Sequence, residues 1–257
     1  MKNLGAFNTH FCASVPYSLE ERIRLSYTIA KYSSEKQISY YETSSAEGTD
    51  ARSIAEYGNA KTLTNSINKA NQRTFNKLLN HNNSKFYLGS FVDITPKFIK
   101  SNYKEFENGF DIIHENTTFQ FYDGNRDLQI DYLSQVLKSD GIMIFTEKML
   151  QKDMNEYKKR EDIKNKLHKL KYFSQDEIEW KDEKIMQAIL KYEVRVGSLI
   201  NSIKRKFKYV YMIWNSSNFY RFVASNNKDN IERFISLLPK AYVPEEFCYE
   251  ENLPKRF

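Results

Sequence analysis

The chain of 257 residues contains only two cysteines and four histidines. Cys12 and Cys248 lie near opposite ends, and the sequence has no Cys-x-x-Cys pair and no histidine–cysteine cluster. This scarcity of soft ligands argues against a zinc site, and we expect no bound metal. We expect both thiols to be reduced, although the sequence alone also permits a disulfide between them.

Long apolar runs are also missing. No run approaches the roughly 18 residues that a membrane-spanning helix needs, and no basic-then-apolar leader opens the sequence. We therefore expect a soluble, cytoplasmic protein without a membrane partner. The 39 Lys and Arg exceed the 33 Asp and Glu by a mild +6, which allows an anionic partner such as nucleic acid but does not favour one. The oligomeric state stays open.

Strand-like and helix-like segments alternate over the first 149 residues, after an irregular start at residues 1–16. We predict strands at 37–44, 60–66, 85–94, 109–119 and 141–149, and helices at 18–32, 48–57, 67–83, 96–106 and 125–141. This alternation predicts an α/β fold with a mainly parallel sheet and helices on both faces.

The pattern changes after residue 148. Residues 148–206 are dense in charge, free of proline and mostly helical in pattern, and two strands (208–215 and 218–225) and a helix (228–238) follow. We therefore predict one domain over 1–257 with a seven-stranded sheet. An N-terminal helical cap (1–35) and a helical insertion or lid (148–206) between strands five and six complete it.

The stretch "YYETSSAEGTDARSIAEY", residues 40–57, leads from the first strand through a tight turn into a helix. Every second position from 42 to 48 holds an acidic or small residue: Glu42, Ser44, Ala46 and Gly48. Small residues let the backbone approach a ligand and let the next helix pack closely. Serine and alanine fit there without strain only if those positions do not need a positive φ. The alternative is a plain strand–turn–helix connection with a buried glutamate.

This turn and the order of the elements resemble class I, Rossmann-like, S-adenosylmethionine-dependent methyltransferases over roughly residues 18–240. The resemblance implies S-adenosylmethionine as cofactor. It implies that Glu42 receives the cofactor's ammonium group and that Ser44, Ala46 and Gly48 border its methionine and ribose. Tyr17 and Arg22 could then reach the methionine carboxylate as an anion clamp.

The sequence departs from this family at the next two strand ends. Asn65 stands where an acid usually accepts both ribose hydroxyls, and an amide can accept but carries no charge; alternatively, Asn65 caps the next helix. Ser90 replaces the acid that usually contacts the adenine, with Phe91 placed to pack on the base, or Asp93 takes the polar role. Ordinary loop chemistry explains these residues equally well.

The fourth strand ends in His114 and Glu115, where open α/β sheets bind ligands. A histidine beside a glutamate could act as a general base next to the cofactor, although a lone histidine is more often structural. Aromatic residues follow this strand and recur in the sixth. We predict that four of them line a pocket for the methyl acceptor, or alternatively that they belong to the hydrophobic core: Phe119, Phe121, Tyr122 and Trp214.

The resemblance thus implies methyl transfer to a small molecule with an apolar or aromatic part. One alternative is an RNA or protein acceptor, supported by a basic run between residues 158 and 171. A second is a non-catalytic accessory protein, supported by the absent acids at Asn65 and Ser90. A nicotinamide dehydrogenase is disfavoured because the fingerprint glycines are missing. The Asn-Pro-Pro-Tyr signature of enzymes that methylate base or glutamine nitrogens is missing too.

Overall fold

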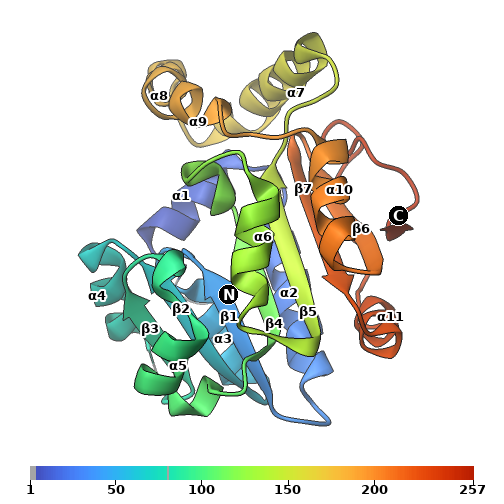
Figure 1. The fold of residues 1–257 in the computed structure, drawn as a ribbon. Coiled ribbons are helices and arrows are strands. Elements are labelled where there is room, and N and C mark those ends of the chain that lie inside the picture. Colours follow the sequence, from blue (N-terminus) through green and yellow to red (C-terminus); the bar gives the residue numbers. More distant parts are fainter. Residues whose placement is uncertain (1–3, 80) are drawn as a thin grey trace.

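A single twisted sheet forms the centre of the computed structural model, which describes residues 4–79 and 81–257 (Figure 1). The strands are β1 (Ile38–Thr43), β2 (Ala60–Ser66), β3 (Ser84–Leu88), β4 (Phe110–Asn116), β5 (Leu137–Lys148), β6 (Tyr209–Ser216), β7 (Phe219–Ser225) and β8 (Lys255–Arg256). Their order is β3-β2-β1-β4-β5-β7-β6-β8. Strands β1 to β5 are parallel, and β7 runs antiparallel between β5 and β6.

The prediction of a mostly parallel α/β sheet is confirmed, with one difference in strand number. The described residues form eight strands instead of seven because the two-residue β8 adds to the edge at β6. The helices are α1 (Ala6–Ser14), α2 (Ser18–Tyr32), α3 (Thr49–Tyr57), α4 (Lys69–Leu78), α5 (Pro96–Asn102), α6 (Arg126–Ser134), α7 (Met154–Leu167), α8 (Gln175–Lys181), α9 (Gln187–Leu190), α10 (Val196–Lys206) and α11 (Lys228–Ser236).

Helices cover both faces of the sheet. Leu25 of α2 and Ile54 of α3 share one apolar core with Tyr40, whereas Leu133 of α6 shares the other core with Tyr41. Successive side chains of a strand point to opposite faces, so the two neighbouring tyrosines of β1 enter different cores. Burial on both faces explains the short apolar runs at residues 112–113 of β4 and 142–145 of β5.

Two predicted segments were wrong. Residues 1–16 are not irregular, because α1 occupies Ala6–Ser14. The helix predicted over 125–141 ends at Ser134, because β5 already begins at Leu137 and pairs with Phe110 of β4. The ladder with β4 outweighs the helical periodicity of these residues, which is a tertiary effect.

The charged segment after β5 divides into two parts. Helices α7, α8 and α9 project from the α/β body beside α1 (Figure 1), whereas α10 returns to the core through Leu199 and Ile203. Lys148 at the end of β5 is buried and pairs with Glu161 and Glu193, which anchors the projecting part. Within residues 4–79 and 81–257, no helix has the length and apolar character to cross a bilayer.

Candidate functional site

A cavity of about 670 Å³ opens where β1 and β4 lie side by side. The strand order reverses at this point, since β2 and β3 follow β1 on one side and β5 follows β4 on the other. Open α/β sheets bind ligands at the carboxyl ends of strands at such a switch. The walls come from α1, α2 and the segments after β1 to β4: Phe7, Asn8, Phe11, Arg22, Ser44, Ser45, Ala46, Ser66, Ile67, Asn68, Asn71, Ser90, Asn116, Thr117, Thr118, Phe121 and Tyr122.

The turn after β1 has a left-handed backbone at three alternating positions. The φ angles are 46° at Ser44, 52° at Ala46 and 63° at Gly48. The condition for unstrained serine and alanine is therefore not met, because both occupy the region that favours glycine. At Gly48 an added Cβ would lie 2.8 Å from side-chain carbons of Phe75 and Thr64, so any other residue would force these side chains to shift.

Asn65 is fully buried and holds this turn in place. Its amide oxygen accepts hydrogen bonds from the Tyr41 hydroxyl (2.8 Å) and the Ser44 backbone N–H (3.0 Å), and its amide nitrogen donates to the Gly89 carbonyl (2.9 Å). The alternative role as a helix cap is wrong, because Asn68 caps α4 by accepting from the Ala70 N–H. Asn65 lies behind the cavity and joins the ends of β1, β2 and β3.

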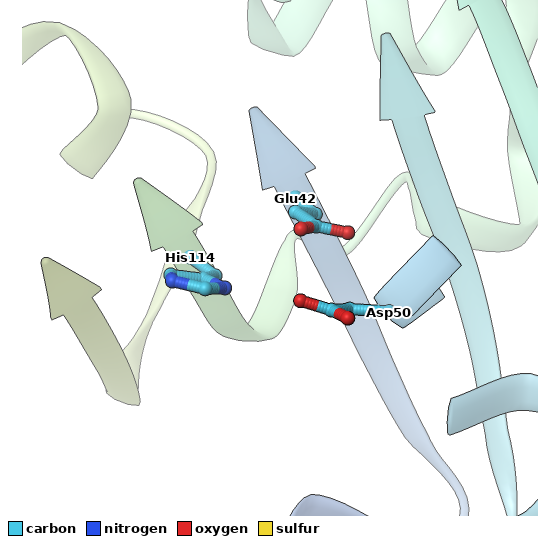
Figure 2. Close-up of side chains that lie close together, drawn as sticks. All are labelled: Glu42, Asp50 and His114. Atoms are coloured by element: carbon cyan, nitrogen blue, oxygen red, sulfur yellow. The ribbon is translucent and has the colours of Figure 1, made fainter. Parts of the chain in front are cut away.

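Glu42 is also buried, together with Asp50 and His114 (Figure 2). Its carboxylate accepts hydrogen bonds from the Asn116 amide (2.9 Å) and the Ala51 N–H (3.2 Å). Burial, and next the neighbouring Asp50, raise the pKa of Glu42 to about 8. The Oδ2 atom of Asp50 is buried without a hydrogen-bond partner among the described residues. A neutral Glu42 carboxyl group avoids repulsion from the neighbouring Asp50 carboxylate.

One potential ligand atom from each of these three side chains lies within 4.8 Å of the others. Carboxylate and imidazole ligands suit a divalent cation. However, Arg22 already pairs with Asp50 at 2.9 Å, and both ring nitrogens of His114 have hydroxyl partners, Tyr40 (3.2 Å) and Thr146 (2.9 Å). This engagement favours a hydrogen-bonded network over a metal site.

The predicted acid–base pair does not face the cavity. His114 is fully buried, and burial, then Arg221 and Arg22, hold its pKa well below the usual range, so the ring is neutral. Glu115 is buried and accepts hydrogen bonds from the backbone N–H groups of Thr118 and Phe119. The cavity wall at this strand end is instead formed by the next three residues, 116–118.

Comparisons with known proteins identify the architecture. No family model and no curated protein matches this sequence. The plantazolicin methyltransferase BpumL in complex with SAH superposes with a TM-score of 0.55 at 12% identity, covering 80% of this chain and 84% of that chain. Its complex with a triazolic desmethylPZN analog and SAH gives 0.55 and 12%, covering 82% and 88%. The chain has the class I S-adenosylmethionine-dependent methyltransferase fold.

Of the four aromatic residues predicted to form the acceptor pocket, two line the cavity and two are buried in the hydrophobic core. Tyr122 and Phe121 border the cavity, and the Tyr122 hydroxyl lies 2.8 Å from Ser90 Oγ. Phe119 and Trp214 are buried in the cores, where Arg126 and Arg221 lie over their rings. These two are core residues, the alternative that the sequence left open.

Three more predicted cofactor contacts lie outside the cavity wall: Tyr17, Gly48 and Phe91. Phe91 is buried and packs edge-on against Tyr122 at a centroid distance of 4.7 Å. Tyr17 packs against Tyr242 and Phe247 and does not line the cavity. Asp93 accepts hydrogen bonds from the Ser90 N–H and the Tyr87 hydroxyl and so shapes the loop after β3.

Sequence reasoning placed a helical cap at residues 1–35 but did not name the residues of α1 that line the cavity. Phe7, Asn8 and Phe11 form one wall of the cavity, and the Glu47 carboxylate holds the start of this helix. Glu47 accepts from the Phe7 N–H (2.6 Å) and from the Asn8 side-chain amide (2.8 Å). The four-residue spacing of Phe7 and Phe11 was the available signal, since it places both rings on one helical face.

Proposed function

We propose that the protein is an S-adenosylmethionine-dependent methyltransferase whose acceptor is a small molecule with an apolar or aromatic part. The observation that carries this proposal is the cavity at the switch between β1 and β4, bordered by residues 44–46 of the turn with left-handed backbone. Its volume of about 670 Å³ suits a cofactor and part of an acceptor. The two BpumL structures with the same fold contain SAH, which supports the choice of cofactor.

The cofactor would lie along the turn after β1, where Ser44 and Ala46 bring backbone to the wall. Ser90 would contact the base edge, and Arg22, which lies in the wall next to Asp50, would attract the carboxylate. Glu42 acts one layer deeper, because Asn116 stands between it and the cavity. When bound, the cofactor supplies a methyl group on a positively charged sulfur.

The walls favour catalysis by positioning. Among the described wall residues, Arg22 and Tyr122 are the only ones with ionisable side chains, and no carboxylate or imidazole is present. We infer an acceptor whose reacting atom is nucleophilic without a strong protein base. Phe7, Phe11 and Phe121 would hold its apolar part and exclude water, which lowers the barrier of an in-line displacement.

An RNA acceptor is less well supported. Three basic residues of the run at 158–171 point inward: Arg160 pairs with Glu156, Lys164 pairs with Glu161, and Lys169 is buried. The remaining exposed lysines make a weaker electrostatic surface than the sequence suggested. Binding to RNA that weakens steeply with added salt would favour this alternative.

Isothermal titration with S-adenosylmethionine and SAH tests the proposal. We expect binding of both in the wild-type protein and its loss in Asn71→Trp, because Asn71 is a half-buried wall residue on α4. Arg73→Trp is the matched control, since this exposed position on the same helix does not border the cavity. No heat at millimolar ligand would contradict the catalytic proposal and favour an accessory protein.

A further inference from the structure

A second groove of about 530 Å³ lies between α1 and the projecting helix α8. It is separate from the cofactor cavity, because His10 of α1 borders the groove whereas Phe7 and Phe11 border the cavity. Helix α8 lies above α1 in Figure 1, and hydrogen bonds from Lys181 to His10 and Ser14 join the two helices. Its described lining consists of His10, Lys169, Phe173, Asp176, Glu177, Ile178, Trp180, Lys181 and Ile185.

The polar end of the groove holds two lysines, Lys169 and Lys181. Lys181 Nζ lies 2.6 Å from His10 Nε2 and 3.1 Å from Ser14 Oγ, and no described carboxylate lies within ion-pair distance. Lys169 is only 7% exposed and likewise forms no ion pair with the described residues. Such desolvated ammonium groups gain from a bound anion.

The acidic residues behind this end are already paired with other lysines. Lys148 pairs with Glu161 and Glu193, and Lys164 pairs with Glu161, so both carboxylates are already engaged by other ammonium groups. Burial, then Lys164, lowers the pKa of both Lys169 and Lys181 to about 8.

The two acids that line the groove form no ion pair with Lys169 or Lys181. Glu177 accepts hydrogen bonds from the Ser174 N–H and hydroxyl, which caps α8, and Asp176 is exposed. His10 is held towards its neutral form, because burial and then Lys181 and Lys169 lower its pKa.

The other end of the groove is apolar and open to solvent. Trp180 is 58% exposed and Ile185 is 40% exposed, although both are large apolar side chains. Ile178 is buried at the base, and the Phe173 ring packs against His10 at a centroid distance of 4.9 Å. A ligand with an apolar body could cover this surface.

We propose that this groove binds a small amphiphilic anion, an aliphatic or aromatic carboxylate. Lys169 and Lys181 hold the carboxylate, and Trp180 with its apolar neighbours covers the hydrocarbon. The site is independent of the proposed methyl transfer, because α1 separates it from the cofactor cavity.

Tryptophan fluorescence of the full chain tests the site. The chain has two tryptophans, and Trp214 is buried, so Trp180 reports on the groove. Titration with octanoate at pH 7 should give a saturable emission shift that is lost in Trp180→Phe. Octan-1-ol and octylammonium should bind at least tenfold more weakly. The affinity for octanoate should fall above pH 8 as the two ammonium groups lose their protons.

Removal of the two charges supplies the second arm. Lys169→Met/Lys181→Met should weaken octanoate binding at least tenfold, while Lys166→Met/Lys184→Met, at exposed positions outside the groove, should not change it. Absence of any shift, or equal binding of octanol and octanoate by the wild-type protein, would overturn the proposal. Equal binding of octanol would mark a merely apolar surface, and this comparison does not depend on the variants folding.

Discussion

The amide oxygen of Asn65 accepts a hydrogen bond from the backbone N–H of Ser44 at 3.0 Å. This contact joins the end of β2 to the turn that borders the proposed cofactor site. The side-chain amide nitrogen of Asn65 donates to the Gly89 carbonyl just after β3. The residue that departs from the usual acid of this fold is thus required here as a donor as well as an acceptor.

We expect Asn65→Asp to destabilise the protein, although it restores an acid at this strand end. The carboxylate would lose the donor to Gly89 and face a buried carbonyl oxygen, which costs about 1–3 kcal/mol in free energy of unfolding. Thermal unfolding measures this loss. Asn59→Asp, at an exposed position, is the control, and equal stability of both variants would contradict the assigned role of Asn65.

Ala46→Gly should be neutral or stabilising by up to about 1 kcal/mol. Glycine removes the cost of a left-handed alanine, roughly 1–2 kcal/mol, and this gain is partly offset by its larger chain entropy in the unfolded state. Chemical denaturation compares it with Ala55→Gly in the interior of α3, which should lose about 1 kcal/mol. A clear loss in Ala46→Gly would show that the alanine side chain contributes to the turn.

Glu42→Gln should change how stability depends on pH. Folding raises the pKa of Glu42 from 4.5 to about 8, so between these values the folded state holds the extra proton. The contribution of Glu42 is full below pH 4.5 and is lost as the pH rises towards 8. In Glu42→Gln this decline is absent.

The measurement is the free energy of unfolding from pH 5 to pH 8 for both proteins. The buried Glu115, Glu147 and His114 titrate in both and cancel in the difference. Parallel curves for wild type and Glu42→Gln would refute the raised pKa.

Glu47→Gln should loosen α1 and weaken cofactor binding together. The charged acceptor at the start of the helix is lost, at a cost of about 1–3 kcal/mol. Hydrogen exchange of the amides in Ala6–Ser14 should accelerate, while that of α11 should stay constant. Glu56→Gln, at an exposed position, is the matched control. Faster exchange of the α1 amides in this control as well would contradict a specific role of Glu47.

Local pattern in the sequence determined most of the framework. The segments Ala60–Ser66 and Ser18–Tyr32 were predicted at their observed bounds, because alternation and helical spacing are set by neighbouring residues. The turn around Gly48 was placed correctly for the same reason. By contrast, the start of β5 at Leu137 depends on Phe110, which lies 27 residues earlier.

Tertiary structure decided which polar groups reach the cavity. His114 and Asn116 share one face of β4 and Glu115 points to the other, yet only Asn116, the last residue of the strand, borders the cavity. The structural role of Asn65 depends on hydrogen bonds with Ser44 and Gly89, which lie over 20 residues away in each direction. The sequence by itself determined that a turn of this kind follows β1. Only packing determined which side chains enclose the cavity, because their partners come from distant segments.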